Sequence, residues 1–161
     1  MRKFAIASTA LAAFLATIMS GDVQAASGPF AGMAGSWSGG GTLTMSDGHN
    51  EPLRCRAAYG VAEDGRNLRL NLQCASDSYN FNLAGDVRYQ GGAIAGSWSE
   101  SSRNTGGTIS GRANGNRIEA VARGDSFSAS LALTTGVGRQ SVIIQPQGTD
   151  VRAVAVTLNR R

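Results

Sequence analysis

The sequence is poor in the residues on which most catalytic and metal-binding sites depend. It has one histidine, two cysteines and three prolines, and only 16% of its 161 residues are charged. It contains no G-x-S-x-G, P-loop, H-E-x-x-H or calcium-loop motif, each of which arranges the groups that its chemistry needs. Two cysteines and one distant histidine do not complete the tetrahedral ligand set of a zinc site. We therefore expect no metal, no cofactor and no catalytic residue, and we interpret the chain as a non-enzyme.

Lysine is almost absent too, and the one lysine, Lys3, lies in a predicted export signal. Met1-Arg2-Lys3 is a basic head, residues 4–18 form a short apolar run, and Val23-Gln24-Ala25 presents small residues where a signal peptidase cleaves. The alternative is a membrane helix, but the run is shorter than the roughly 20 apolar residues that a helix needs to span a bilayer. The sequence predicts a signal peptide over residues 1–25 and a periplasmic or secreted protein without a stable membrane anchor.

All basic residues that remain after cleavage are arginines. The remaining 136 residues carry 13 arginines and 10 acidic residues, a net charge of +3. Arginine suits carboxylate and phosphate partners, but codon usage in a GC-rich genome also explains the bias, and we favour that explanation. Because the arginines are scattered and the net charge is small, we expect no nucleic-acid partner. The length is that of one domain, which we place at residues 35–161 after a flexible lead-in over residues 26–34.

The two cysteines lie on the two arms of a predicted β-hairpin over residues 53–74. Apolar and polar residues alternate on both sides of Asp64-Gly65, a dipeptide typical of a tight hairpin turn. This turn places Cys55 opposite Cys74. Facing Cα atoms in an antiparallel pair are about 4.5–5.5 Å apart, which a disulfide accepts. In an oxidising compartment we predict a Cys55–Cys74 disulfide, and two buried free thiols are the alternative.

Similar turn signals divide the rest of the chain into ten candidate strands, each joined to the next by a hairpin. The expected turns, at residues 46–50, 76–77, 91–92, 114–115, 124–125 and 137–138, predict the pairs Leu43–Cys55, Cys74–Tyr79, Gly85–Trp98, Ile109–Ala120, Ile118–Leu131 and Leu133–Val142. The last strand, around residues 151–158, is apolar on both faces, so its register stays open. On the polar side, Arg112 falls opposite Arg117. An anion would relieve their repulsion, or the two side chains splay apart in solvent.

A series of hairpins with one apolar face must bury that face. Curling into an up-and-down barrel buries it and removes the unpaired edges of the sheet. Glycines such as Gly85, opposite Trp98, favour the sharp bends that this curling requires. We therefore predict an all-β protein, an antiparallel up-and-down β-barrel of about 8–10 strands, with no helix after the signal peptide.

The first predicted strand carries a family resemblance. Its sequence, AGSWSGGGTLTM, resembles the Gly-x-Trp start of lipocalin-type and avidin-type barrels, which implies that Trp37 plugs one end of the barrel and is structural. A wider pattern, formed by GSWSGGGTLTMSDG, LRCRAAYG, CASDSYNF and GSWSES, is similar to small exported alphaproteobacterial proteins of unknown function. That second resemblance implies no activity.

Aromatic side chains provide the main candidate site, because several share the predicted apolar face. These side chains are Trp37, Tyr59, Phe81, Tyr89 and Trp98. They line a cavity for a small apolar ligand, or they fill the interior as a core, as side chains do in small barrels. The sequence leaves both interpretations open.

Two polar positions give weaker candidates. His49 lies between Asp47 and Glu51, which suggests a metal or proton-transfer site or a solvated hairpin loop, and we favour the loop. Glu100 has the same strand parity as Trp98 and falls at a barrel rim, where a single carboxylate is usually solvated. General acid–base catalysis needs at least two placed groups or one strongly tuned group, and the sequence shows neither.

Three functions remain compatible with these observations. The first is a periplasmic barrel that binds a small hydrophobic ligand. The second is an interaction module for an envelope protein, such as a hydrolase inhibitor, with a packed core. The third is a small outer-membrane barrel, against which the short loops and the lack of aromatic girdles argue.

Overall fold

The structure is a computed structural model that describes residues 27–161, and the predicted signal peptide lies outside the described residues. A single turn of 3₁₀ helix, η1 (Ala31–Met33), precedes ten strands, so the expectation of no helix after residue 25 is wrong at this turn. The strands are β1 (Gly35–Met45), β2 (Asn50–Val61), β3 (Asn67–Ala75), β4 (Asn80–Gln90), β5 (Ala93–Glu100), β6 (Thr105–Asn114), β7 (Arg117–Arg123), β8 (Ser128–Thr135), β9 (Arg139–Gln147) and β10 (Val151–Arg160). Within residues 27–161, no helix has the length and apolarity needed to span a membrane.

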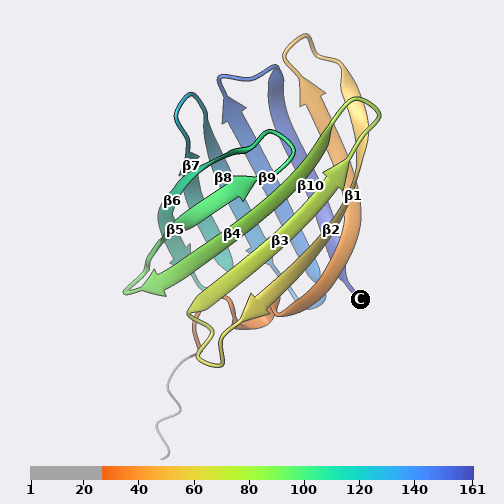
Figure 1. Ribbon diagram of the computed structural model, residues 1–161. Coiled ribbons are helices and arrows are strands. Elements are labelled where there is room, and N and C mark those ends of the chain that lie inside the picture. Colours follow the sequence, from red (N-terminus) through yellow and green to blue (C-terminus); the bar gives the residue numbers. More distant parts are fainter. Residues whose placement is uncertain (1–26) are drawn as a thin grey trace, which may run out of the picture.

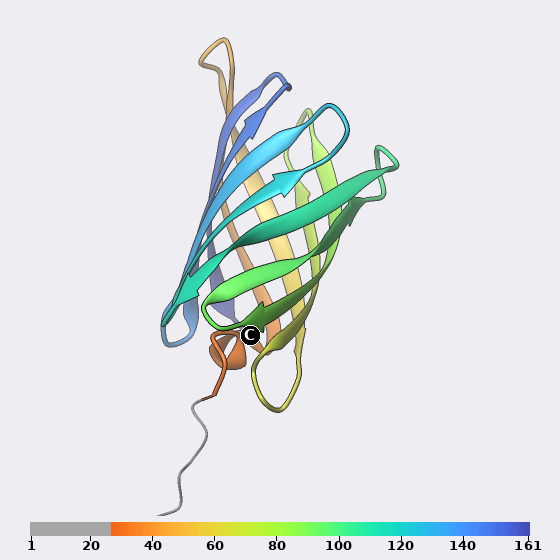
Figure 2. The ribbon, with the colours of Figure 1, turned by 90° about the vertical axis from the view of Figure 1, so that its left-hand side faces the viewer.

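The strands form one closed antiparallel barrel (Figures 1 and 2). Each strand pairs with its neighbours in sequence, and β10 pairs with β1 to close the barrel. This confirms the predicted all-β, up-and-down barrel. One end carries the loops that join β1 to β2, β3 to β4, β5 to β6, β7 to β8 and β9 to β10, and η1 lies against the other end.

Strand β2 shows most clearly how the sequence specifies the barrel wall. Buried and exposed residues alternate along it, so that Cys55 and Tyr59 face the interior while Arg54 and Arg56 face solvent. Successive side chains of a strand point to opposite faces of the sheet. The period-two pattern therefore turns directly into an apolar interior and a polar exterior.

The register between β2 and β3 is the predicted one. Cys55 lies opposite Cys74, and the two form the predicted disulfide, with Sγ atoms 2.05 Å apart and Cα atoms 4.1 Å apart. Both cysteines are buried inside the barrel. The predicted pairs Gly85–Trp98 and Leu133–Val142 are also confirmed.

Four other predicted registers are wrong, each by an even number of residues. The observed pairs are Gly39–Cys55, Cys74–Phe81, Ile109–Ala122 and Ile118–Leu133. The three later hairpins turn one residue further along the chain than predicted, and the first turns two residues earlier. An even displacement changes the partner and leaves each side chain on its own face of the sheet, so the predicted apolar face still lies inside.

The same displacement removes the predicted Arg112–Arg117 pair. Arg112 lies opposite Glu119, and Arg117 lies opposite Asn114. Nη2 of Arg117 is 2.6 Å from Oε1 of Glu119. Arg112 and Arg117 therefore do not repel each other as predicted, and no anion is needed between them. Arg117 instead forms an exposed ion pair with Glu119, and such a pair contributes little to stability.

The lead-in packs against the barrel instead of lying loose in its described part, residues 27–34. Phe30 is 0% exposed and Met33 is 1% exposed. Backbone N–H groups of Gly28 and Phe30 donate to the carbonyl oxygens of Asp64 and Gly65 in the loop between β2 and β3. The segment thus covers one end of the barrel (Figure 2).

Inward-facing glycines allow the strands to bend tightly. A Cβ atom at Gly41 would lie 1.8 Å from the carbonyl oxygen of Ala155 on β10, and one at Gly107 would lie 1.8 Å from that of Arg123. No side chain fits where two backbones approach so closely. The curvature that closes the barrel therefore depends on glycine at these points.

Candidate functional site

The end of the barrel near η1 is sealed by a packed cluster around Trp37. Its indole N–H donates to the carbonyl oxygen of Met33 at 2.8 Å. Its ring meets Tyr59 edge to face, with centroids 6.4 Å apart, and the guanidinium carbon of Arg160 lies 4.5 Å from its centroid. Arg160 also donates to the carbonyl oxygen of Ala34. Trp37 therefore occupies the end-plugging position that the Gly-x-Trp resemblance implies.

A buried hydrogen bond crosses the interior just inside this closed end. The hydroxyl of Tyr59 on β2 donates to Oε1 of Gln140 on β9 at 2.6 Å, and Nε2 of Gln140 donates to Oγ1 of Thr135 at 3.1 Å. Strands β2 and β9 are not neighbours in the barrel. Burial raises the pKa of Tyr59 to about 12, although the bond to Gln140 opposes the shift. Tyr59 is therefore a neutral structural group at physiological pH.

The rest of the interior is less completely filled. Several inward-facing apolar side chains between the two ends are only partly buried, namely Leu70, Leu72, Ile109, Leu133, Val142 and Ile144. Eight strands make a barrel that side chains just fill, and ten make a wider one. Small inward-facing residues such as Gly85, Ala113 and Ala120 occupy little of the interior. These side chains therefore leave part of the apolar inner surface of the barrel uncovered.

The five aromatic residues singled out from the sequence do not gather into one site. Trp37 and Tyr59 belong to the closed end, and the backbone N–H of Tyr89 donates to Arg66 in a loop at that end. Trp98 and Phe81 belong to the open half. The buried ring of Trp98 meets Phe127 edge to face at 5.6 Å, whereas Phe81 is partly buried.

An aromatic pair and an arginine lie at the open end, and the sequence interpretation did not include this group. The rings of Tyr79 and Phe81 stack with centroids 6.1 Å apart and an interplanar angle of 12°. The guanidinium carbon of Arg103 lies 5.8 Å from the Tyr79 centroid and 5.3 Å from the Phe81 centroid. The inward parity of Tyr79 and Phe81 was the sequence signal for this group, and nothing signalled Arg103, which belongs to the loop between β5 and β6.

Glu100 lies at the open rim as predicted, but it is buried and not solvated. It is 4% exposed, and its carboxylate accepts hydrogen bonds from the backbone N–H groups of Asn82, Ser102 and Arg103 at 2.9, 3.0 and 2.8 Å. Burial raises the pKa of Glu100, but these bonds outweigh it and hold the pKa below its usual range. The carboxylate is buried because it supplies the acceptor that the backbone N–H groups of the adjacent loop need.

Glu51 has the same role at the neighbouring hairpin. Its carboxylate accepts hydrogen bonds from Oγ of Ser76 at 2.7 Å and from the N–H of Ser78 at 3.1 Å, and these bonds lower its pKa. His49 is exposed, with Nε2 4.0 Å from Oε1 of Glu51. In the described part of the chain, no three His, Cys, Asp or Glu side chains come together as metal ligands.

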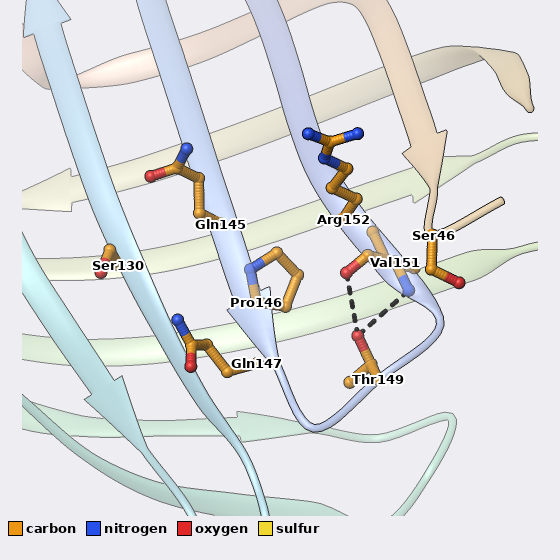
Figure 3. Close-up of a pocket in the computed structure, with 8 residues that line it drawn as sticks. All are labelled: Ser46, Ser130, Gln145, Pro146, Gln147, Thr149, Val151 and Arg152. Carbon is orange, nitrogen blue, oxygen red and sulfur yellow. Dashed lines mark hydrogen bonds between the residues drawn. The ribbon is translucent and has the colours of Figure 1, made fainter. Parts of the chain in front are cut away.

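A separate groove of about 440 Å³ lies on the outer surface at the open end (Figure 3). It is lined by Ser46, Ser130, Gln145, Pro146, Gln147, Thr149, Val151 and Arg152. Oγ1 of Thr149 is bonded to the backbone of Val151, and the amides of Gln145 and Gln147 are exposed. Because its polar groups do not converge on one point, we regard the interior as the candidate site.

Comparisons with known proteins identify the fold. No family model and no curated protein matches the sequence. Among solved structures, the barrel is similar to the S-type phycobiliprotein lyase CpeS from Guillardia theta, with a TM-score of 0.53 and 11% sequence identity over 82% of this chain and 89% of that chain. At this identity the likeness shows the fold alone. The protein thus has a lipocalin-like fold, a closed ten-strand antiparallel meander.

Proposed function

We propose that the protein is a non-enzymatic, exported barrel that binds a small apolar ligand inside its open half. The partly exposed apolar side chains that face the interior carry this proposal. One end is sealed by Phe30, Met33 and Trp37, so a ligand enters past the hairpin loops at the other end. Covering apolar surface yields roughly 25 cal/mol per Å², and such cavities are the usual small-molecule sites of barrels.

The polar groups in and around the interior support binding without catalysis. The carboxylates of Glu51 and Glu100 are occupied by N–H and hydroxyl groups of the rim loops, and their lowered pKa values make them poor bases near neutral pH. The hydroxyl of Tyr59 is occupied by Gln140. The proposal therefore assigns these groups to the framework of the barrel.

The proposed location rests on the signal-like residues 1–25 and on the disulfide, which persists in oxidising compartments. The outer faces of the strands carry exposed polar residues such as Arg54, Arg69 and Asn71. A barrel in an outer membrane needs an apolar outer band roughly 25 Å tall. We therefore favour an aqueous periplasmic or secreted protein over the outer-membrane alternative.

Two neighbouring positions on β3 allow a matched test. Leu72 faces the interior and Gln73 faces solvent. The neutral fluorescent probe N-phenyl-1-naphthylamine would be titrated into the mature protein, purified without detergent, and into its Leu72→Trp and Gln73→Trp variants. We expect saturable binding by the wild type and by Gln73→Trp, and loss of binding by Leu72→Trp because its ring fills the space.

The folded state of each variant is checked by its melting transition. Native mass spectrometry of the wild type adds an independent readout, because a carried ligand appears as an extra mass that disappears on denaturation. Failure of the wild type to bind the probe, together with a bare polypeptide mass, would reject the ligand-binding proposal. The interaction module for an envelope protein would then be the better hypothesis.

A further inference from the structure

Arg103 is fixed in place at the open end of the barrel. Its backbone N–H donates to Oε2 of the buried Glu100 at 2.8 Å, and the same oxygen lies 3.5 Å from its Nη1. Nη1 also donates to the carbonyl oxygen of Asn80 at 3.1 Å. The guanidinium is therefore held between two hairpin loops, over the stacked rings of Tyr79 and Phe81.

The loop that carries Arg103 is itself ordered by side-chain bonds. Glu100 Oε1 accepts from the backbone N–H groups of Asn82 and Ser102, and Nδ2 of Asn82 donates to Oγ of Ser102 at 2.9 Å. Asn104 completes the turn with a φ of 50°, a conformation that asparagine tolerates. A pre-organised guanidinium loses little conformational entropy when it binds a partner.

Much of the hydrogen-bonding capacity of Arg103 is unused. A guanidinium has five N–H donors. Of the guanidinium nitrogens of Arg103, only Nη1 donates a hydrogen bond to a residue within the range 27–161. The edge formed by Nε and Nη2 has no acceptor there, and the side chain is 45% exposed. This edge presents two parallel N–H groups, the geometry that a carboxylate accepts in bidentate fashion.

We infer that Arg103 binds the acidic head group of an amphipathic carboxylate whose apolar chain lies in the barrel interior. The inference rests on the proposed function, because it needs the interior to hold the apolar chain. Phe81 links the two regions, since its ring lies under the guanidinium and its strand continues inward through Leu83. Glu100 offsets the charge of Arg103, so the fork of N–H groups, more than net charge, selects the carboxylate.

Displacement of bound N-phenyl-1-naphthylamine by dodecanoate and by 1-dodecanol tests the inference. The two competitors share an apolar chain and differ in the head group. We expect dodecanoate to bind the wild type about tenfold more tightly than dodecanol, the effect of a charge-assisted hydrogen-bonded pair. Arg103→Gln should abolish this preference, because the affinity for dodecanoate falls to that for dodecanol. Arg103→Lys, which keeps the charge but not the fork, should retain only a small part of it.

Arg88→Gln is the matched control, because Arg88 is an exposed arginine on the outer face of β4. It should bind both competitors as the wild type does. Equal affinity of the wild type for dodecanoate and dodecanol, or a preference that survives in Arg103→Gln, would overturn the head-group site while the apolar interior stands. Absence of probe binding by the wild type would instead reject the proposed function on which this inference rests.

Discussion

The guanidinium of Arg160, on the last strand, lies over the indole ring of Trp37, on the first strand, with its central carbon 4.5 Å from the ring centroid. The two residues are also direct partners in the register between β1 and β10. The contact between Arg160 and Trp37 therefore links the β1–β10 pairing, which closes the barrel, to the cluster around Trp37, which seals one end of it.

Replacing Arg160 with alanine should lower the free energy of unfolding by about 2 kcal/mol, because it removes the contact with Trp37 and the hydrogen bonds to the carbonyl oxygens of Ala34 and Gly32. Urea unfolding measures the difference. Arg161→Ala is the control, since within residues 27–161 Arg161 bonds only to the exposed side chain of Ser38 and to the backbone of Ser36. Equal losses in the two variants would contradict a special role for the Trp37 contact.

Removing the Cys55–Cys74 disulfide should lower the free energy of unfolding by about 2–4 kcal/mol, since the cross-link restricts the unfolded chain. The double variant Cys55→Ala, Cys74→Ala and the reduced wild type should lose similar amounts in urea unfolding. A double variant as stable as the oxidised wild type would show that the disulfide does not stabilise this barrel.

Acid should destabilise the protein through its two rim glutamates. The folded-state pKa values of Glu51 and Glu100 lie below their ordinary value of 4.5. Their stabilising effect is therefore complete above about pH 4.5 and is lost as the pH falls through the folded-state values. The variant Glu100→Gln should be less stable at pH 7 and should show a weaker loss of stability in acid. Parallel pH curves for wild type and variant would contradict this assignment.

Alkali should act through Tyr59, whose pKa in the folded protein is about 12 against an ordinary 10. Because the folded state favours the neutral phenol, its contribution is complete below pH 10 and is lost as the pH rises toward 12. The shift corresponds to about 2–3 kcal/mol. Tyr59→Phe should lack this part of the alkaline loss in urea unfolding, and an unchanged alkaline profile would show that Tyr59 does not cause it.

Adding one methyl group at Gly41 should destabilise the barrel by about 3 kcal/mol, because the Cβ would lie 1.8 Å from the carbonyl oxygen of Ala155. The matched change, Gly60→Ala on the outer face of β2, meets atoms no closer than 3.8 Å and should alter stability by less than about 1 kcal/mol. Thermal melting compares the two. Similar melting temperatures for both variants would mean that the backbone at Gly41 relaxes easily.

The alternating pattern was sufficient to predict which face of each strand lies inside, except for β10, which is apolar on both faces, but it did not fix every partner. Displacing a hairpin by two residues keeps every side chain on its own face, so the pattern alone does not detect the error. At Asn114-Gly115 the favoured turn dipeptide suggested one position, and the chain turns at Gly115-Asn116 instead. Where the apolar pattern and the turn agreed, at Asp64-Gly65, the partners and the disulfide were both right.

The site was less predictable than the fold because its residues are held by loops. The burial of Glu100 depends on backbone N–H groups of a loop whose conformation the sequence does not specify. The position of Arg103 depends in turn on Glu100. The burial of Phe30 and Met33 was also missed, since a short 3₁₀ turn lacks the period-two signal of the strands.

Because β1 pairs with β10, the barrel does not close until nearly the whole chain is present. The intervening hairpins form from contacts close in sequence, whereas this last pairing joins residues at opposite ends of the domain and carries the largest loop-closure cost. We therefore expect a slow final folding step preceded by an open meander. Pairing of β1 with β10 removes the last free edges of the sheet. The edges of these two strands are therefore the ones that stay exposed longest during folding.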